Sequence, residues 1–571
     1  MGAQTKPKIA VVGSGFGGAV MACRLAESGL AEVHVFERGA RYGRNEFPRR
    51  VSELRRAFWD PEDGRHGLFE LRSFGRAKMD IVTAAGLGGG SLIYSNVLYR
   101  VPDALLQQWP ANLRRAQLDP YYSKAERMLG AARYPAADPD SPYHNTPKSW
   151  ALFHAASKMR AQPNSGPGIT HEWPHLAITF GAEPGLSQRN AHGVQQSACT
   201  GCGECNIGCN IAAKNTVDLN YLALASARGA KIHTYRELRE LRRDVENGDV
   251  AGAMAKPADL KPWHLELRDP TTGETFHESF DHVVLAAGAV GTTEILLRLQ
   301  RGRPQMSPTV GSRFSPNGDL LGFVSGTRAA AMPTLGPVIT GAIRFDHGTD
   351  PHGQPSSIWV EDGGFPPLLA MAVYAGVLSK HPRTVLARLW QNSRLLGQRL
   401  AARVMGRRHL RLGQAAGDFL FGGDEIISHT LPLLAMGRDT AHGQFVLKED
   451  GPRHDQLDLQ WSARASDYHY ERARESMRAI AETVGGTMVE NLGSYFSRYV
   501  TVHPLGGAPL SHDRSTGAVD AATGEVFGAR GLFVADGSLM PTAAGPNPAL
   551  TIAALSEYFA QRLCDQLRGS G

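Results

Sequence analysis

Four of the six cysteines lie in one run with the spacing C-x2-C-x2-C-x3-C, at Cys199, Cys202, Cys205 and Cys209. Ferredoxins hold iron–sulfur clusters on this spacing, although Asn210 stands where their run has a proline. Structural zinc sites usually divide their ligands into two separated pairs, so zinc fits less well. Thiols of a cytoplasmic protein are not expected to form disulfides. The run predicts one iron–sulfur cluster, 4Fe-4S or 3Fe-4S, with structural cysteines as the alternative.

Near the end of the chain, His503 stands in an apolar, strand-like run just before two glycines. An imidazole titrates near neutral pH and can take up a proton, but a lone histidine in an apolar strand is more often a core residue. Further on, Asn547 lies between Pro546 and Pro548, which fix its geometry, and a helix-like run follows. The first amides of that helix point at whatever lies in front of them.

The elements that must position these side chains begin with a dinucleotide-binding pattern. A strand-like run is followed by a glycine turn and a helix-like run, and the turn comprises Gly13, Gly15, Phe16, Gly17 and Gly18. Gly13 allows the tight turn, Gly15 lets the backbone approach phosphates, and Gly18 lets helix and strand pack closely. The free amides and positive end of such a helix bind a pyrophosphate. A second strand ends at Glu37, which can accept hydrogen bonds from ribose hydroxyls.

Three later segments fit the same nucleotide-binding domain. Consecutive glycines before Ser91 suit a backbone that presses against a flat ligand, whose polar edge Asn96 could reach; a flexible surface loop is the alternative. A strand, a glycine turn and a helix around Gly288 indicate a return to this domain, and a late strand ends at Asp536. The candidate cofactor-binding residues in these segments are Gly88, Gly89, Ser91, Asn96, Gly288 and Asp536.

The composition is globular and mildly basic. The 571 residues carry a formal net charge of +6, which gives no reason to expect a nucleic-acid partner, and a chain of this length is expected to form two domains. The glycine pattern starts too near the first residue to leave room for a signal sequence, so we expect a cytoplasmic protein. No apolar run reaches the length of a membrane span. Cys23 and Cys564 stand alone in helix-like sequence and are expected to be small buried residues.

One stretch concentrates the positive charge. Residues 383–411 carry eight arginines, interleaved with leucines, and no acidic residue. A cationic amphipathic helix of this kind suits peripheral contact with an anionic membrane surface or with an acidic partner protein. The alternative is a solvated helix that covers the second domain with long arginine side chains.

Taken together, the motifs resemble the glucose–methanol–choline (GMC) oxidoreductase family. The resemblance rests on the glycine turn with Glu37, the run around Gly288, Val502-His-Pro-Leu-Gly-Gly507, and Ala535-Asp-Gly-Ser-Leu539 followed by Asn547-Pro548, in this order. The runs Gly-Gly-Gly-Ser-Leu, Ala-Lys-Asn-Thr and Ala-Asp-Gly-Ser-Leu are most similar to the cholesterol oxidase branch.

The resemblance implies FAD and an α/β fold. A Rossmann-like FAD-binding domain is then interleaved with an α+β substrate domain built on an antiparallel sheet. We expect residues 1–101, 205–310 and 499–571 in the FAD-binding domain, and residues 102–204 and 311–498 in the substrate domain.

The resemblance also implies roles for single residues. His503 matches the active-site histidine beside the flavin, which takes the hydroxyl proton, and Asn547 matches the partner that holds the substrate oxygen. Asp536 would bind the ribityl chain or flavin edge, and the helix after Pro548 would place its positive end near the reduced flavin. Cholesterol oxidases use an extra carboxylate to move a ring double bond, and Glu361 lies in the corresponding region; an ordinary exposed carboxylate is the alternative.

The sequence thus predicts an FAD-dependent enzyme that oxidises a bulky apolar alcohol, such as a sterol, and passes electrons to oxygen, a quinone or a carrier protein. Membrane-associated sugar dehydrogenases of the superfamily carry an iron–sulfur cluster on a cysteine run in the corresponding segment, which supports a cluster here. The arginine-rich segment departs from the resemblance and leaves the substrate open between a sterol and a terpenoid, long-chain or sugar-like alcohol. A non-catalytic flavin electron-transfer protein is an alternative of another class.

Overall fold

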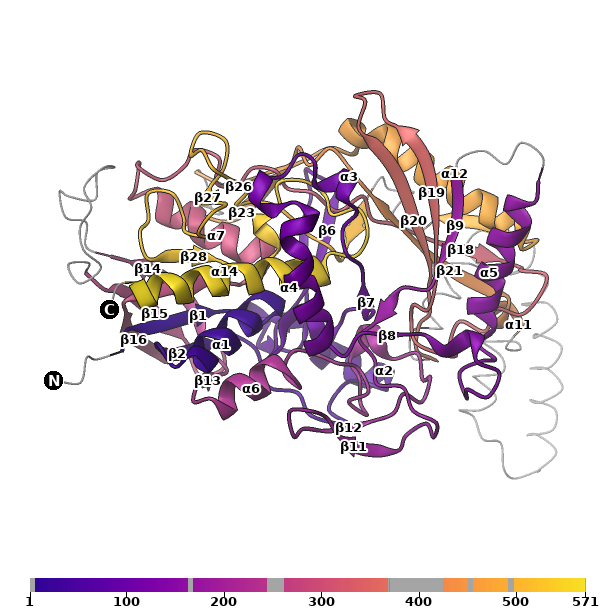
Figure 1. Cartoon of the computed structure of the whole chain (residues 1–571), viewed down its shortest axis with the longest axis horizontal. Helices are drawn as coiled ribbons and strands as arrows, with labels where there is room; N and C mark the ends of the chain where they lie inside the picture. Colours follow the sequence, from indigo (N-terminus) through magenta and orange to yellow (C-terminus); the bar gives the residue numbers. More distant parts are fainter. Residues whose placement is uncertain are drawn as a thin grey trace, which may run out of the picture.

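The computed structural model describes residues 6–162, 168–243, 261–367, 369, 425–449, 455–490 and 498–569. A parallel sheet lies on the left of Figure 1 and an antiparallel sheet on the right. The arginine-rich segment 383–411, with its predicted membrane or partner contact, lies outside the described residues. Within the described ranges, no helix combines the length and the apolar character that crossing a membrane requires.

The parallel sheet has five strands in the order β13 (Lys231–His233), β2 (Glu32–Phe36), β1 (Lys8–Val12), β17 (His282–Leu285) and β28 (Leu532–Val534). All four neighbouring pairs are parallel. The middle strands are apolar along their length, as expected of a parallel sheet that is covered on both faces. Because their carboxyl ends meet at one edge, the turns that follow β1, β2, β17 and β28 lie close together.

The main helices around this sheet are α1 (Phe16–Ser28), α4 (Arg115–Met128), α6 (Tyr221–Ala227), α7 (Gly288–Gln300) and α14 (Ala549–Gly569). Helix α1 packs against α6 and α14, and α14 packs against α4. Cys23 on α1 and Cys564 on α14 are both buried, as the sequence predicts.

The antiparallel sheet has six strands in the order β24 (Thr487–Glu490), β18 (Leu320–Ser325), β21 (Thr430–Gly437), β20 (Pro355–Asp362), β19 (Ala342–Thr349) and β9 (Gly168–Glu172). Helices α5 (Pro147–Arg160) and α12 (Asp467–Thr483) pack against it and against each other. Helix α12 buries Tyr470, Ala473, Met477 and Ile480, whose spacing is that of one helix face. A parallel sheet with helices and a separate antiparallel sheet confirm the predicted fold class.

Smaller sheets complete the chain. The hairpin of β5 (Phe69–Phe74) and β6 (Met79–Ala84) is extended by β25 (Tyr499–Thr501), and a second sheet consists of β14 (Glu237–Arg242), β15 (Trp263–Arg268) and β16 (Thr275–Phe280). The remaining short helices and strands are α2 (Val51–Leu54), α3 (Asp103–Leu106), α11 (Glu425–Ser428), β3 (Trp59–Asp60), β4 (Arg65–His66), β7 (Val97–Leu98), β8 (Ala132–Arg133), β10 (His175–Leu176), β11 (Ser187–Arg189), β12 (Gln195–Ser197), β22 (Gln444–Leu447), β23 (Leu457–Gln460), β26 (Leu510–Ser511) and β27 (Val519–Asp520).

The predicted domain ranges stay a prediction, and one helix departs from them. The strands of the parallel sheet come from ranges assigned to the FAD-binding domain, and those of the antiparallel sheet from ranges assigned to the substrate domain. Helix α4, however, lies in the predicted substrate range 102–204. Its Leu118 and Tyr122 belong to the core around the parallel sheet, because the apolar face of α4 packs on α14.

A buried ion pair fastens the helices of this core. The side chain of Glu557 on α14 is fully buried, and Arg24 on α1 donates to it through Nε and Nη2 at 2.8 and 2.6 Å. The Tyr221 hydroxyl of α6 donates at 2.9 Å, and Lys124 Nζ of α4 lies 3.2 Å away. One carboxylate therefore connects four helices.

We predict that Glu557→Ala lowers the free energy of unfolding by about 3–5 kcal/mol, since it leaves buried cationic and hydroxyl groups without their partner. Glu27→Ala is the matched control. It removes the half-buried carboxylate that pairs with the same arginine at 2.5 Å, and should cost about 1 kcal/mol or less. Urea unfolding of both variants checks this, and equal losses would contradict the role assigned to Glu557.

Candidate active site

A cavity of about 710 Å³ lies between the two sheets. One end is lined by the turns at the carboxyl edge of the parallel sheet, and the other by β18 and β21 of the antiparallel sheet. His503, Asn547 and the turn residues Gly13, Gly15, Phe16 and Gly17 all contact this one cavity, although they are far apart in the sequence. Gly18 is not among the lining residues.

The glycine turn after β1 has the geometry that the pattern predicts. A Cβ atom on Gly13, whose φ is +98°, would lie 2.2 Å from the carbonyl oxygen of Ala286, and a Cβ atom on Gly18 would lie 2.0 Å from that of Gly13. Gly15 is different, since its nearest neighbour would be 4.0 Å away. Helix α1 begins at Phe16 without a side-chain cap, so its first amides are free to bind a phosphate group.

Glu37 lies beside this turn at the end of β2. Its carboxylate accepts hydrogen bonds from the Ser14 hydroxyl at 2.5 Å and from the Gly39 amide at 2.9 Å. Burial raises the pKa of Glu37, against the effect of these bonds. An uncapped helix start, backbone without side chains and a carboxylate at the end of the second strand together fit a dinucleotide.

The second glycine segment, residues 86–97, lines the cavity with the backbone of its glycines and also with Ile93, Tyr94, Ser95 and Val97. Gly89 and Gly90 line it, and a Cβ atom on Gly89 would lie 2.7 Å from Cα of Gly15. The predicted residues Gly88, Ser91 and Asn96 are not among the lining residues. The Ser91 hydroxyl donates to the Gly88 carbonyl and accepts the Val217 amide. The buried Asn96 side chain has no hydrogen-bond partner within the described ranges.

Asp536 joins the turns that follow β17 and β28. Its carboxylate accepts the Gly288 amide at 3.0 Å, the Thr292 hydroxyl at 2.5 Å and the Ser538 amide at 2.8 Å. Burial raises the pKa of Asp536. Gly288, Asp536 and Pro548 all line the cavity, and α14 begins directly after Pro548.

His503 lines the cavity, and a hydrogen bond to Asp319 fixes the orientation of its ring. Its Nδ1 lies 2.8 Å from Oδ1 of Asp319, and the other carboxylate oxygen accepts the Thr501 hydroxyl at 2.8 Å and the Val502 amide at 3.0 Å. Asp319 comes directly before β18 and also lines the cavity. A carboxylate can only accept, so in the neutral imidazole Nδ1 carries the ring proton and Nε2 presents a lone pair.

Asn547 lines the cavity, and Glu361 lies behind it. The Asn547 side-chain amide donates to Glu361 Oε2 at 3.4 Å, while its own Oδ1 has no partner in the part of the chain that the structure describes. Glu361 at the end of β20 is fully buried, and burial raises its pKa well above the ordinary value. It is not a lining residue of the cavity, and its Oε1 has no partner among the described residues. The alternative of an ordinary exposed carboxylate is therefore wrong, because the last five residues of β20 are all buried.

The wall beyond His503 is apolar. Leu321 and Val502 keep 37% and 51% of their surface exposed and both line the cavity. They are joined by Phe323, Val338, Ile339, Phe365, Pro432 and Leu434. Exposed apolar side chains around a cavity favour an apolar ligand.

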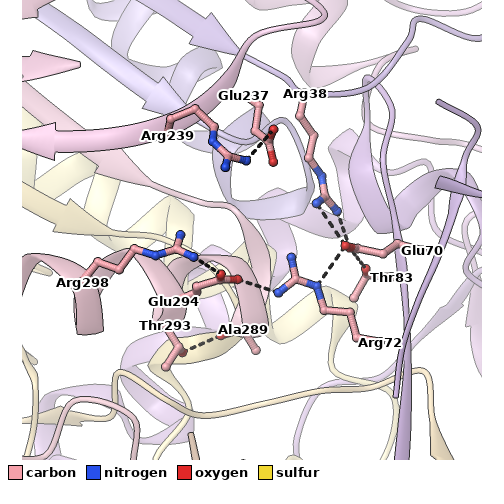
Figure 2. A network of polar contacts seen from close by, with 10 residues as sticks. All are labelled: Arg38, Glu70, Arg72, Thr83, Glu237, Arg239, Ala289, Thr293, Glu294 and Arg298. Carbon is pink, nitrogen blue, oxygen red and sulfur yellow. Dashed lines mark hydrogen bonds and ion pairs between the residues drawn. The ribbon is translucent and has the colours of Figure 1, made fainter. Parts of the chain in front are cut away.

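A ladder of alternating charges follows the cavity wall at the dinucleotide end (Figure 2). Arg38 after β2 pairs with Glu70 on β5 at 2.5 Å, Arg72 on β5 pairs with Glu70 at 2.9 Å, and Arg72 pairs with Glu294 on α7 at 2.6 Å. Arg298 completes the ladder, 2.5 Å from Glu294. Burial opposes ionisation of Glu70, but Arg38 and Arg72 outweigh it and hold the pKa of Glu70 below its ordinary value. The ladder ties the β5–β6 hairpin to α7.

The four predicted metal ligands, Cys199, Cys202, Cys205 and Cys209, line one small pocket of about 10 Å³. Backbone amides donate to the sulfur atoms of Cys199 and Cys209 at 3.2–3.4 Å. Burial raises the pKa of Cys202 to about 12, so without a cation this thiol is protonated. In the described part of the chain, no three His, Cys, Asp or Glu side chains are arranged to hold a metal ion. The arrangement thus does not support the predicted iron–sulfur cluster.

The cysteine segment nevertheless contacts the large cavity. Asn206 lines that cavity directly after Cys205 in sequence. The buried Lys214 donates to the carbonyl oxygens of Leu92 and Cys205 at 2.7 and 2.5 Å, and burial lowers its pKa to about 8. The segment is therefore fastened to the second glycine segment.

Two parts of the site were not predicted from the sequence. Asp319 follows a turn-forming Asn-Gly pair, and no local motif connects it with His503, 184 residues away. The charge ladder combines residues from three separate elements, and only the arginine-rich composition between residues 41 and 76 hints at part of it.

Comparisons with known proteins bear on the family and the fold. Family models described as GMC oxidoreductase match residues 11–316 and 435–556. Cholesterol oxidase of Acinetobacter baumannii is 27% identical over 570 residues, which cover 96% of this chain and 92% of that protein. Cholesterol oxidase of Mycobacterium tuberculosis (strain H37Rv) is 27% identical over 590 residues, covering 97% and 90%. The crystal structure of pyridoxine 4-oxidase from Mesorbium loti has a TM-score of 0.59 at 15% identity, with 98% and 99% covered, and shows the same fold.

We predict that Glu294→Gln speeds the release of FAD about tenfold, because it weakens the tie between the β5–β6 hairpin and α7 on the cavity wall. The measurement is the rise of free-flavin fluorescence after dilution of the purified protein. Glu237→Gln is the matched control. The carboxylate of Glu237 pairs at 3.2 Å with Arg239 of the same strand, β14, so this pair lies within a single element. Similar release rates for both variants would contradict a role of the ladder in cofactor retention.

Proposed function

Because the chain belongs to the GMC oxidoreductase family and is an FAD-dependent enzyme that oxidises alcohols, we propose that its substrate is a bulky apolar alcohol, such as a sterol. The observation that carries this proposal is a single cavity that combines a dinucleotide cradle, an imidazole with a free lone pair and an apolar wall. The family affiliation removes the alternative of a non-catalytic flavin electron-transfer protein.

The residues of the cradle would hold the cofactor. The amides at the start of α1 and the side-chain-free backbone at Gly15 and Gly89 suit the pyrophosphate, and Glu37 suits the ribose. Bound FAD supplies the acceptor for the hydride that leaves the carbinol carbon. Asp536 and the start of α14 after Pro548 lie on the same cavity and suit the flavin end.

The chain's own part in the reaction is to hold the alcohol and to take its proton. His503 Nε2 accepts the hydroxyl proton, while an N–H of Asn547 donates to the same oxygen and fixes its position. The apolar wall around Phe323 and Leu434 binds the carbon skeleton and excludes water. Substrate oxygen, proton acceptor and hydride donor carbon are thereby aligned.

Glu361 stays a proposal as a catalytic residue. A double-bond shift in a sterol ring needs a carboxylate that reaches the ring, whereas Glu361 does not line the cavity and contacts the Asn547 amide instead. Its contact with the Asn547 amide supports a role in orienting that amide. A terpenoid or long-chain alcohol would fit the same apolar wall, whereas a sugar-like alcohol would find few polar groups on it.

We predict that His503→Ala keeps FAD bound but slows flavin reduction by the substrate about 10²–10⁴-fold, because the hydroxyl proton loses its acceptor. His512→Ala is the matched control, an exposed histidine after β26 that should keep the wild-type rate. Anaerobic rapid mixing with sterol, terpenoid, long-chain and sugar alcohols measures the rate and identifies the substrate class. A wild-type rate in His503→Ala would contradict the proposal.

We propose that the electron acceptor is either a carrier protein or, directly, oxygen or a quinone. Iron analysis distinguishes these cases. The cysteine spacing predicts an iron–sulfur cluster with Cys199, Cys202, Cys205 and Cys209 as ligands, but the arrangement of these side chains in the structure does not support it. With a cluster, protein purified without oxygen should contain several irons per chain and absorb broadly near 400 nm after the flavin is released. A pure flavin spectrum without iron would make the cysteines structural and leave oxygen or a quinone as direct acceptor.

A further inference from the structure

We propose that Asp319 is a positioning residue of the reaction. Its carboxylate accepts a hydrogen bond from Nδ1–H of His503 and thereby keeps the Nε2 lone pair toward the alcohol. The inference rests on the proposed function, because it assigns Asp319 a task only if His503 takes the hydroxyl proton. Asp319 would act through His503 and would not itself exchange a proton with the substrate.

The hydrogen bonds around Asp319 fix the orientation of its carboxylate. Oδ1 faces Nδ1 of His503 at 2.8 Å, and Oδ2 accepts both the Thr501 hydroxyl and the Val502 amide. The Thr501 hydroxyl in turn accepts the backbone amide of His503 at 3.0 Å. The carboxylate is almost fully buried, so water does not compete for these positions. His503 is therefore held both at its ring and at its backbone amide.

The consequence for the ring is a single tautomer. Because Nδ1 must donate to the carboxylate, the neutral imidazole has its proton there, and Nε2 makes no hydrogen bond among the described residues. After proton transfer, the imidazolium that forms would be stabilised by the adjacent negative charge. The orientation of the His503 ring and the negative charge of Asp319 thus both favour transfer of the hydroxyl proton to Nε2.

Asp319→Asn tests the tautomer with almost no change in volume. The Val502 amide and the Thr501 hydroxyl donate to one side, so the asparagine oxygen should take that side and its NH2 should face Nδ1. Nδ1 must then accept, and the proton moves to Nε2, where the alcohol would meet a donor instead of a lone pair. We expect the limiting rate of flavin reduction to fall about 10³-fold, with little change in the substrate dissociation constant.

The decisive experiment is a double-mutant cycle on the FAD-loaded enzyme, with an alcohol that the wild type oxidises. Asp319→Asn should cost about 10³-fold in the wild-type background but less than about threefold in His503→Ala, since the histidine through which it acts is gone. A residue that only stabilises the fold would cost the same in both backgrounds. Equal costs, or an unchanged rate in Asp319→Asn, would overturn the inference.

Asp439→Asn is the matched control. Asp439 is likewise a buried carboxylate near the antiparallel sheet; it accepts the Ser315 hydroxyl at 2.7 Å and does not contact His503, so its loss should leave the reduction rate within about threefold. If Asp319→Asn does not retain FAD, Asp319→Ala replaces it in the cycle, and a wild-type rate there would overturn the inference. A wild-type rate in His503→Ala alone would instead overturn the proposed function, so the two failures are distinguishable.

Discussion

Three backbone turns approach one another at the carboxyl edge of the parallel sheet more closely than side chains would allow. The turn after β1 touches the turn after β17 at Gly13, and a Cβ atom on Gly17 would lie 1.6 Å from the carbonyl oxygen of Ala535, after β28. These contacts hold the start of α1 against the ends of β17 and β28. The cavity, the uncapped start of α1 and the position of Asp536 all depend on them.

Buried carboxylates then connect the segments that carry the site. Asp536 collects donors from the turns after β17 and β28, and Asp319 connects the start of β18 with the segment that carries His503. In both cases backbone amides and hydroxyls offset the cost of burying the charge. The residues that orient ligands are therefore held by hydrogen bonds that originate outside their own element.

The sequence predicts the parts of the site that are local. The glycine turn with Glu37 and the strand end at Asp536 are recognisable because strand, turn and helix follow each other directly. Ser91 and Asn96 have suitable residue types, but the path of the backbone through their turn decides which way each side chain points. Asp319 and the charge ladder arise where distant elements pack, and Glu361 becomes buried only through the sheet around it. Such contacts leave no periodic or local signal.

The order of the strands has a consequence for how the protein is made. The edge strand β28 of the parallel sheet pairs with β17. Helix α1, at residues 16–28, packs on α14, at residues 549–569. During synthesis the N-terminal glycine turn therefore emerges long before the elements that complete its surroundings. The cradle stays incomplete until residues 532–569 have been synthesised, so cofactor capture is expected only after these residues have left the ribosome, and chaperones have a long interval in which to act.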